Sequence, residues 1–162
     1  MAMQEDNIHP TDESLLAKVA AFLTQEAWPC EQVGEQMLLR TGYQGVHGQW
    51  TCYAHCRADV DQCLFYSVAP VRAPEVLRPA VAEFVTRANW GLLIGNFELD
   101  YEDGEIRYKT SLQLNGTPLT AELLHPLVYG NVVVMDKYLP ALQAVVALTQ
   151  TPVNDIHAVE ES

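Results

Sequence analysis

The sequence is short of positive charge and of long apolar runs. Nine lysines and arginines stand against 21 aspartates and glutamates, a formal net charge of −12. So acidic a chain is not attracted to phosphate backbones or anionic lipid, and we expect no nucleic-acid partner and no membrane partner. No apolar run approaches the roughly 18 residues of a membrane-spanning helix. The N-terminus, MAMQEDNIHPTDES, lacks the basic start and apolar core of a secretory signal. These absences favour a cytoplasmic location.

The sequence also lacks the common signatures of catalysis and phosphate binding. It contains no Walker glycine–lysine run, no GxGxxG motif, no GxSxG nucleophile elbow and no HExxH motif. Its five histidines are scattered over predicted loops, strands and tails. We therefore expect no enzyme, no catalytic residue and no cofactor. Only a site assembled from residues distant in the sequence would escape this search.

The chain has four cysteines, and the spacing of the closest pair does not suit a metal site. Cys52 and Cys56 flank His55 in QWTCYAHCR, which reads as a strand. Positions four apart on a strand are separated by about 13 Å, too far to share a zinc ion with ligand bonds of about 2.3 Å. In a chain without a secretory signal we expect the thiols to stay reduced and to pack as small hydrophobic side chains.

The composition is that of one ordinary globular domain. The chain has 162 residues, of which 49% are apolar and 19% charged, enough to bury a core without disulfides or metals. The two ends are polar and show no periodic pattern. We expect a single domain over residues 12–149, with a loose N-terminal tail at 1–11 and a loose C-terminal tail at 150–162.

Hydrophobic spacing predicts an α+β fold. The predicted order is a helix, a three-stranded antiparallel meander, a second helix, a β-hairpin and a long C-terminal helix. Pro126 and Pro140 are expected to kink or split the last helix. That helix carries two apolar lines, which either form one wide buried face or leave one line for a further partner. The predicted ranges are 12–27 for the first helix, 30–40, 49–57 and 61–68 for the strands, 75–90 for the second helix, 97–114 for the hairpin and about 120–148 for the last helix.

A cluster of acids in the predicted hairpin is the main candidate for chemistry. The stretch GNFELDYEDGEIRYKTSL holds five carboxylates within eight residues. A metal-dependent regulator or an enzyme that uses the acids of residues 98–105 is therefore the alternative function. The acids are Glu98, Asp100, Glu102, Asp103 and Glu105.

The alternation of side chains favours a solvated hairpin face instead. If Phe97 and Leu99 face the core, Glu98 faces outward, opposite Arg107 and Lys109 of the return strand. The spacing also fails the EF-hand pattern, which needs glycine at the sixth position and glutamate at the twelfth. Counted from the aspartate at position 100, the glycine is fifth and the twelfth residue is a serine. We therefore predict no metal ligands here.

Aromatic residues on the predicted strands are the candidate binding residues. Trp50 lies on one strand face, while Tyr53 and Tyr66 lie on the other. Aromatic anchors on a charged surface are what peptide-binding grooves use. From the sequence alone, core packing explains each of these rings equally well.

The run FVTRANWGLLIGNFELDYEDGEIRYKTSLQL, followed by LTAELLHPLVYGNVVVMDKYLPAL, resembles the YbjN family. The specific features are the asparagine–aromatic–glycine step at Asn89–Gly91, the GNFELD strand and the DGEIRYK return strand. They cover residues 84–142, and Trp90 stands where a tyrosine is common in the family. The first eighty residues match mainly in the order of their elements.

The YbjN family is similar in fold to the type III secretion chaperones, whose order of elements is the one predicted above. Those chaperones are small, acidic, cytosolic and usually dimeric. The resemblance implies a non-catalytic protein- or peptide-binding module, acting as a chaperone-like or regulatory adaptor. It also implies a homodimer with a protein or peptide partner.

Overall fold

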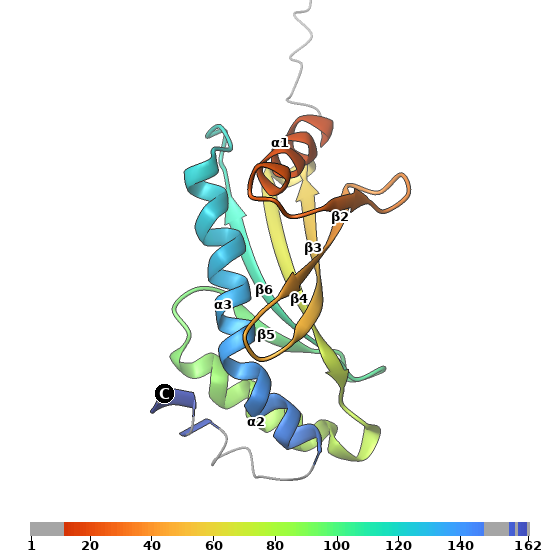
Figure 1. Ribbon diagram of the computed structural model, residues 1–162, viewed down its shortest axis with the longest axis vertical. Helices are drawn as coiled ribbons and strands as arrows, with labels where there is room; N and C mark the ends of the chain where they lie inside the picture. The colour runs from red at the N-terminus through yellow and green to blue at the C-terminus, as the bar shows by residue number, and fades with distance from the viewer. Residues whose placement is uncertain (1–11, 148–155, 158, 162) are drawn as a thin grey trace, which may run out of the picture.

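The computed structural model describes residues 12–147, 156–157 and 159–161. Figure 1 shows the order of elements along the chain. The predicted tail at 1–11 and most of the one at 150–162 lie outside the described residues. The elements are α1 (Asp12–Gln25), β1 (Cys30–Gln32), β2 (Leu38–Gln44), β3 (Gln49–Arg57), η1 (Ala58–Val60), β4 (Gln62–Arg72), η2 (Glu75–Leu77), α2 (Arg78–Gly91), β5 (Asn96–Leu99), β6 (Glu105–Gln113) and α3 (Ala121–Val146).

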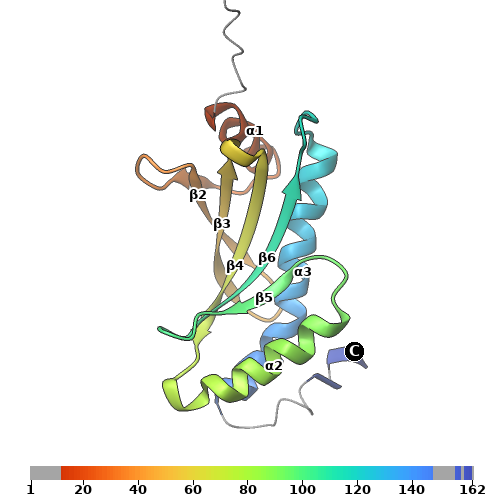
Figure 2. The same cartoon turned by 180° about the vertical axis from the view of Figure 1, so that it is seen from behind.

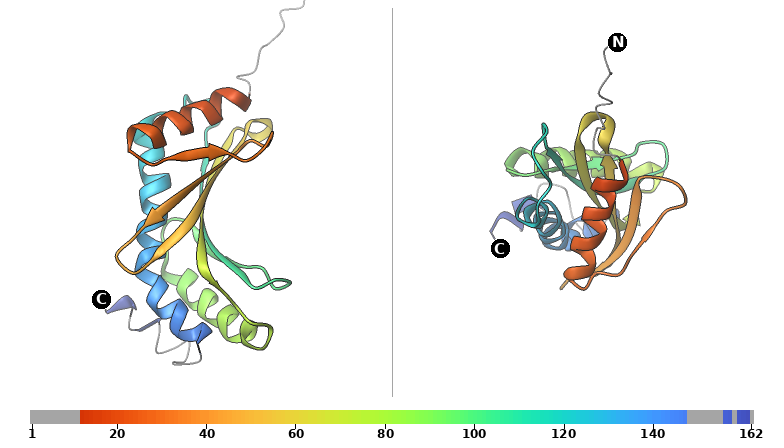
Figure 3. Two further views of the ribbon diagram at one scale, coloured as in Figure 1. Left: turned by 45° about the vertical axis from the view of Figure 1, so that its right-hand side comes forward. Right: turned by 90° about the horizontal axis from the view of Figure 1, so that it is seen from above.

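The predicted α+β fold is confirmed. Across the described residues, six strands form one antiparallel sheet in the order β1-β2-β3-β4-β6-β5. Helix α3 packs along β4 and β6, α1 packs on β3 near one end of the sheet, and α2 packs on β5 near the other. Figure 3 shows α1 and α2 at opposite ends of α3. None of the described helices is both long and apolar enough to span a bilayer.

The single strand predicted at 30–40 is wrong, because a turn divides it. Strands β1 and β2 pair with each other across residues 33–37. Val33 N–H donates to the carbonyl of Leu38 over 2.9 Å, and Gly34 adopts a φ of +57°. Glycine accepts this left-handed conformation without the steric cost that a side chain brings, so the chain reverses where periodicity alone suggested it continues.

The last helix is not split at its prolines. Helix α3 runs through both Pro126 and Pro140, and both rings are exposed. A proline removes one backbone N–H, which leaves the carbonyl four residues earlier without its helical partner. On the exposed side of a helix, water can satisfy such a carbonyl. All members of the two predicted apolar lines are buried except the half-buried Val146, so the lines form one wide buried face. One line is Leu124, Val128, Asn131, Met135, Tyr138, Leu142 and Val145, and the other is Val132, Leu139 and Val146.

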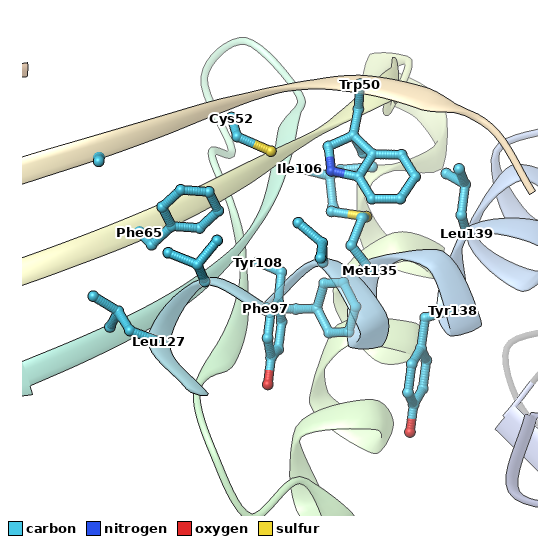
Figure 4. Close-up of a cluster of buried hydrophobic side chains, with 14 of the residues drawn as sticks. Trp50, Cys52, Phe65, Phe97, Ile106, Tyr108, Leu127, Met135, Tyr138 and Leu139 are labelled. Carbon is cyan, nitrogen blue, oxygen red and sulfur yellow. The ribbon is translucent and has the colours of Figure 1, made fainter. Parts of the chain in front are cut away.

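The core lies between the sheet and α3. Figure 4 shows side chains of β3, β4 and β6 meeting those of the helix, with Trp50 pointing from β3 toward Met135 and Leu139. Along β3 every second residue is buried, as the predicted strand pattern requires. The four cysteines form no disulfide within the described residues, and three of them are buried in this core. They are Cys52, Cys56 and Cys63.

One buried polar group ties the helix to the sheet. Asn131 is fully buried, and its Nδ2 donates to the carbonyls of Phe65, at 2.9 Å, and Tyr108, at 3.1 Å. A buried amide needs such partners, because leaving it unbonded costs about 1–3 kcal/mol. These bonds fix the position of α3 relative to β4 and β6.

The C-terminal stretch is partly packed. Residues 156, 157, 159 and 160 are helical, and Ile156 and Val159 are each 6% exposed. A loose tail does not describe these two positions.

Candidate functional site

Three of the five acids of the β5–β6 hairpin, Glu98, Asp103 and Glu105, are paired with cations. Glu98 accepts from Arg107 Nε over 2.7 Å and from Lys109 Nζ. Arg72 donates to Asp103 over 2.6 Å and to Glu105 over 3.3 Å. The predicted outward orientation of this face is therefore observed, with the bases of the return strand opposite the acids.

The same contacts keep two carboxylates ionised. Burial raises the pKa of Glu98, but hydrogen bonds from Lys109 and Arg107 outweigh it and leave that pKa below its ordinary value. The pKa of Asp103 is lowered by the backbone N–H of Glu105 and by Arg72. Among residues 12–147, 156–157 and 159–161, no three histidine, cysteine, aspartate or glutamate side chains are placed to hold a metal ion.

The second candidate region is the face of the sheet opposite α3. Figure 2 shows this face of β3, β4 and β6 without a described helix across it. Tyr53 and Tyr66 are direct cross-strand partners there, and both are half-buried. The guanidinium of Arg107 lies 4.5 Å from the centre of the Tyr66 ring, within the range of a cation–π interaction. The two predicted tyrosines are therefore neighbours on an uncovered surface.

Positive charge gathers on this sheet face although the chain is acidic. Arg40 is the cross-strand partner of Tyr53, and Lys109 is that of Tyr66. A row from β2 to β6 therefore reads arginine, tyrosine, tyrosine, lysine, and we call these four residues the tyrosine row. A hollow of about 400 Å³ borders Arg40 and Tyr53 at one end of the row. A second hollow, of about 420 Å³, is lined by Arg107 and by Glu98, the ion-pair partner of Lys109.

Trp50 does not belong to this surface. It is 4% exposed, and its indole N–H donates to the Ser67 hydroxyl over 2.9 Å in the core. The prediction of Trp50 as a binding residue is corrected. Trp50 and Tyr53 are three residues apart on β3, so their side chains point to opposite faces of the sheet, and Trp50 lies in the core, where its one polar group already has a partner.

A third region was missed by the sequence reasoning. Trp90, in the last turn of α2, is 93% exposed, and Leu93 at 99% and Ile94 at 58% follow in the segment that joins α2 to β5. We call these three side chains the apolar loop. Two signals were available: Trp90 falls outside the buried stripe of α2, and residues 88–97 contain no charged residue.

The apolar loop is held at both ends. The Asn89 side chain accepts from Phe97 N–H at 2.7 Å and donates to the Phe97 carbonyl at 3.1 Å. The Tyr108 hydroxyl donates to the Ile94 carbonyl. Burial, and to a lesser extent Tyr138, raises the pKa of Tyr108 to about 12, so this hydroxyl keeps its proton at neutral pH.

Gly95 completes the anchoring. It adopts a φ of +74°, and a Cβ at this position would lie 2.4 Å from the carbonyl oxygen of Lys109. Only glycine fits so close to the neighbouring backbone in this conformation. The exposed side chains therefore project from a fixed backbone.

Comparison with known proteins places the chain in a family and a fold. Residues 15–144 match the family model of YbjN, described as a putative bacterial sensory transduction regulator. The crystal structure of YbjN from E. coli, described as a putative transcription regulator, has a TM-score of 0.59 at 17% identity, over 80% of this chain and 90% of that one. A chain of the ExsC–ExsE complex has a TM-score of 0.53 at 12% identity, over 81% and 95%. The described fold is thus similar to that of ExsC, a type III secretion chaperone. No curated protein matches the sequence.

Proposed function

Since this chain belongs to the YbjN family, we propose that it is a non-catalytic protein-binding module, a chaperone-like or regulatory adaptor rather than an enzyme. It works in the cytoplasm as a homodimer and holds a protein or peptide partner. The similarity of its fold to a chain from a two-protein complex supports a protein partner. The observed pairing of Glu98, Asp103 and Glu105 with arginine and lysine leaves these three acids poorly suited to be metal ligands or general acids.

One observation carries the choice of site: Tyr53 and Tyr66 stand side by side on the uncovered sheet face. Tyrosine gives a large contact area with little loss of conformational freedom, which makes it a frequent anchor at interfaces. Half-buried rings are already ordered by their neighbours, so that binding costs little additional entropy.

The ends of the tyrosine row define the chemistry of the partner. Arg40 and Lys109 flank the two rings, and each is bound to a carboxylate of this chain, Glu31 and Glu98 respectively. A partner carboxylate would have to replace one exposed pair and one half-buried pair, and it gains little from charge alone. The proposed partner is therefore an extended segment whose apolar or aromatic side chains cover the rings.

The test is quantitative capture from a lysate with the full chain as bait. Wild-type protein is compared with a Tyr53→Ala/Tyr66→Ala double variant and with Tyr101→Ala, a control at an exposed hairpin tyrosine. We expect the same proteins to be recovered with wild type and the control and to be depleted with the double variant, all three being folded by circular dichroism. Equal recovery with the double variant, or no enriched protein with wild type, would contradict the proposed site.

A further inference from the structure

We propose that a second copy of this chain docks on the apolar loop, so that Trp90, Leu93 and Ile94 of two protomers meet around a twofold axis. This inference rests on the homodimer proposed above and names its interface. It is independent of the tyrosine row, which lies on the uncovered sheet face.

The apolar loop is a cluster, whereas other exposed hydrophobic side chains are isolated. Within the described residues, the remaining large ones come from different turns and helices. Single exposed apolar residues are normal on a protein surface, but contiguous ones mark interaction sites. The isolated ones are Val46, Val60, Val76, Tyr101 and Val133.

Charge favours a second copy as the occupant. Two copies with a net charge of −12 each repel one another wherever their acids meet. Residues 88–97 contain no charged residue, and the nearest base along the chain, Arg87, is bound to Glu83 over 2.8 Å. A twofold contact pairs a surface with itself, and this uncharged segment pairs with itself without bringing carboxylates together.

The area is suited to the centre of such an interface. The three side chains expose on the order of 400 Å², comparable to the largest apolar patch of a typical monomer. A standard interface buries about 800 Å² on each partner, with an apolar centre and a polar rim. The apolar loop supplies the centre, and the rim includes a hollow of about 340 Å³ lined by Arg87, Trp90, Ile156, His157 and Glu160. The one carboxylate among the described residues of this hollow, Glu160, thus lies outside the apolar centre, and the cationic Arg87 lines the same hollow.

The contact is made by side chains and not by extension of the sheet. Strand β5 is the edge strand next to the apolar loop, and Phe97 presents its N–H and carbonyl to the open edge. Asn89 occupies both groups, so a partner strand cannot pair at this residue. The same clamp keeps the apolar loop in one arrangement, which lowers the entropy cost of docking.

The experiment measures self-association by light scattering across a dilution series of the full chain. Leu93→Glu and Leu93→Lys each place a charge at the proposed twofold contact without disturbing the fold, because Leu93 is 99% exposed. We expect each to raise the apparent dimer dissociation constant about tenfold or more, the effect of losing one important contact. Mixing the two variants restores association, since opposite charges then meet. Val76→Glu and Val76→Lys are the matched controls at an 84% exposed residue in η2 and are expected to associate as wild type does.

Each other outcome is decisive. If wild type forms dimers and the Leu93 variants associate equally well, the interface is elsewhere and the homodimer proposal stands. If wild type stays monomeric throughout, both the homodimer and this interface are overturned, while the tyrosine row is still judged by its own capture experiment. If the Leu93 variants associate normally but lose captured proteins, the apolar loop is a partner site and not a contact between copies.

Discussion

The acidic hairpin at residues 98–105 and the apolar loop lie at opposite ends of β5, and they differ in what remains available. The hairpin is dense in reactive groups, yet Arg72, Arg107 and Lys109 already engage three of its five carboxylates. The apolar loop has no reactive group, and its backbone is bound while its side chains are free of the core. In this molecule, the side chains available to bind another protein are those without a partner in their own chain, and these are not the most chemically reactive ones.

Replacing one buried and one exposed aromatic residue gives the largest expected difference in the free energy of unfolding. Phe97→Ala removes a ring that is 2% exposed and packs on Tyr108 and Tyr138. We expect a loss of about 3–5 kcal/mol in the free energy of unfolding. Trp90→Ala removes a ring that is 93% exposed, and we expect a change within about 0.5 kcal/mol.

Urea denaturation at low protein concentration measures both variants while self-association is suppressed. A Trp90→Ala loss comparable to that of Phe97→Ala would mean that Trp90 packs within its own protomer, and the contrast between buried and available side chains would fail.

Removing the Asn89 side chain, which holds the apolar loop to β5, gives the next largest expected loss in the free energy of unfolding. Asn89→Ala leaves Phe97 N–H without its acceptor in a partly buried site, and we expect a loss of about 1–3 kcal/mol. Asn96→Ala is the matched control, because Asn96 makes one bond of 3.2 Å to a Phe97 carbonyl that Asn89 also serves. Chemical denaturation ranks the two, and an equal loss in both would show that Asn89 has no special role.

Acid titration probes the paired side of the contrast. The folded-state pKa of Glu98 lies below its ordinary value of about 4.3. Its stabilising contribution is therefore complete above that value and is lost as the pH falls through the lower folded-state pKa. We expect wild type to exceed Glu98→Gln in stability by less than about 1 kcal/mol near neutral pH, with the difference shrinking toward pH 3.

Thermal melts of both proteins across this pH range, with Glu102→Gln as the control for removal of one negative charge from the same turn, give the comparison. A difference between wild type and Glu98→Gln that stays constant with pH would show that the ion pairs to Arg107 and Lys109 do not stabilise the hairpin.

The smallest effect concerns metal ions. Three of the five hairpin acids already bind arginine or lysine, and no three acids of the described residues are placed to hold an ion, so we expect no change in melting temperature with calcium or magnesium at millimolar concentration. A ligand that binds only the folded state raises the melting temperature, and such a rise would revive the alternative of a metal-dependent regulator or enzyme.

Period-two and helical spacing predicted most of the fold, because burial on one face leaves a direct trace in the sequence. Strand β3 has the predicted bounds, and α2 begins where Pro79 fits the first turn, just after the short helix η2. The turn between β1 and β2 escaped because it depends on one glycine with positive φ inside an otherwise extended pattern. The sequence did not predict that α3 would continue through both prolines, because this depends on both proline rings facing solvent.

The candidate surfaces were less predictable, because exposure is a property of the assembled fold. Alternation placed Tyr53 and Tyr66 on one face, but only the observed register makes them neighbours. Alternation also placed Trp50 on the opposite face of the sheet. That face is covered by α3, which is distant in the sequence, so the burial of Trp50 could not be read from its own strand. Trp90 was the predicted last residue of the second helix, but its exposure depends on how α2 and the following segment are fixed to the sheet. The Asn89 clamp, which contributes to this, is a contact between side chain and backbone that no periodicity encodes.

Hydroxyl-radical footprinting of the full chain at low and high protein concentration tests the central contrast most directly. Trp90 and Tyr101 are both exposed, one in the apolar loop and the other in the acidic hairpin. We predict that Trp90 becomes protected as the concentration rises while Tyr101 stays reactive. Unchanged reactivity of Trp90, or equal protection of both rings, would contradict the claim that the apolar loop is the open contact surface.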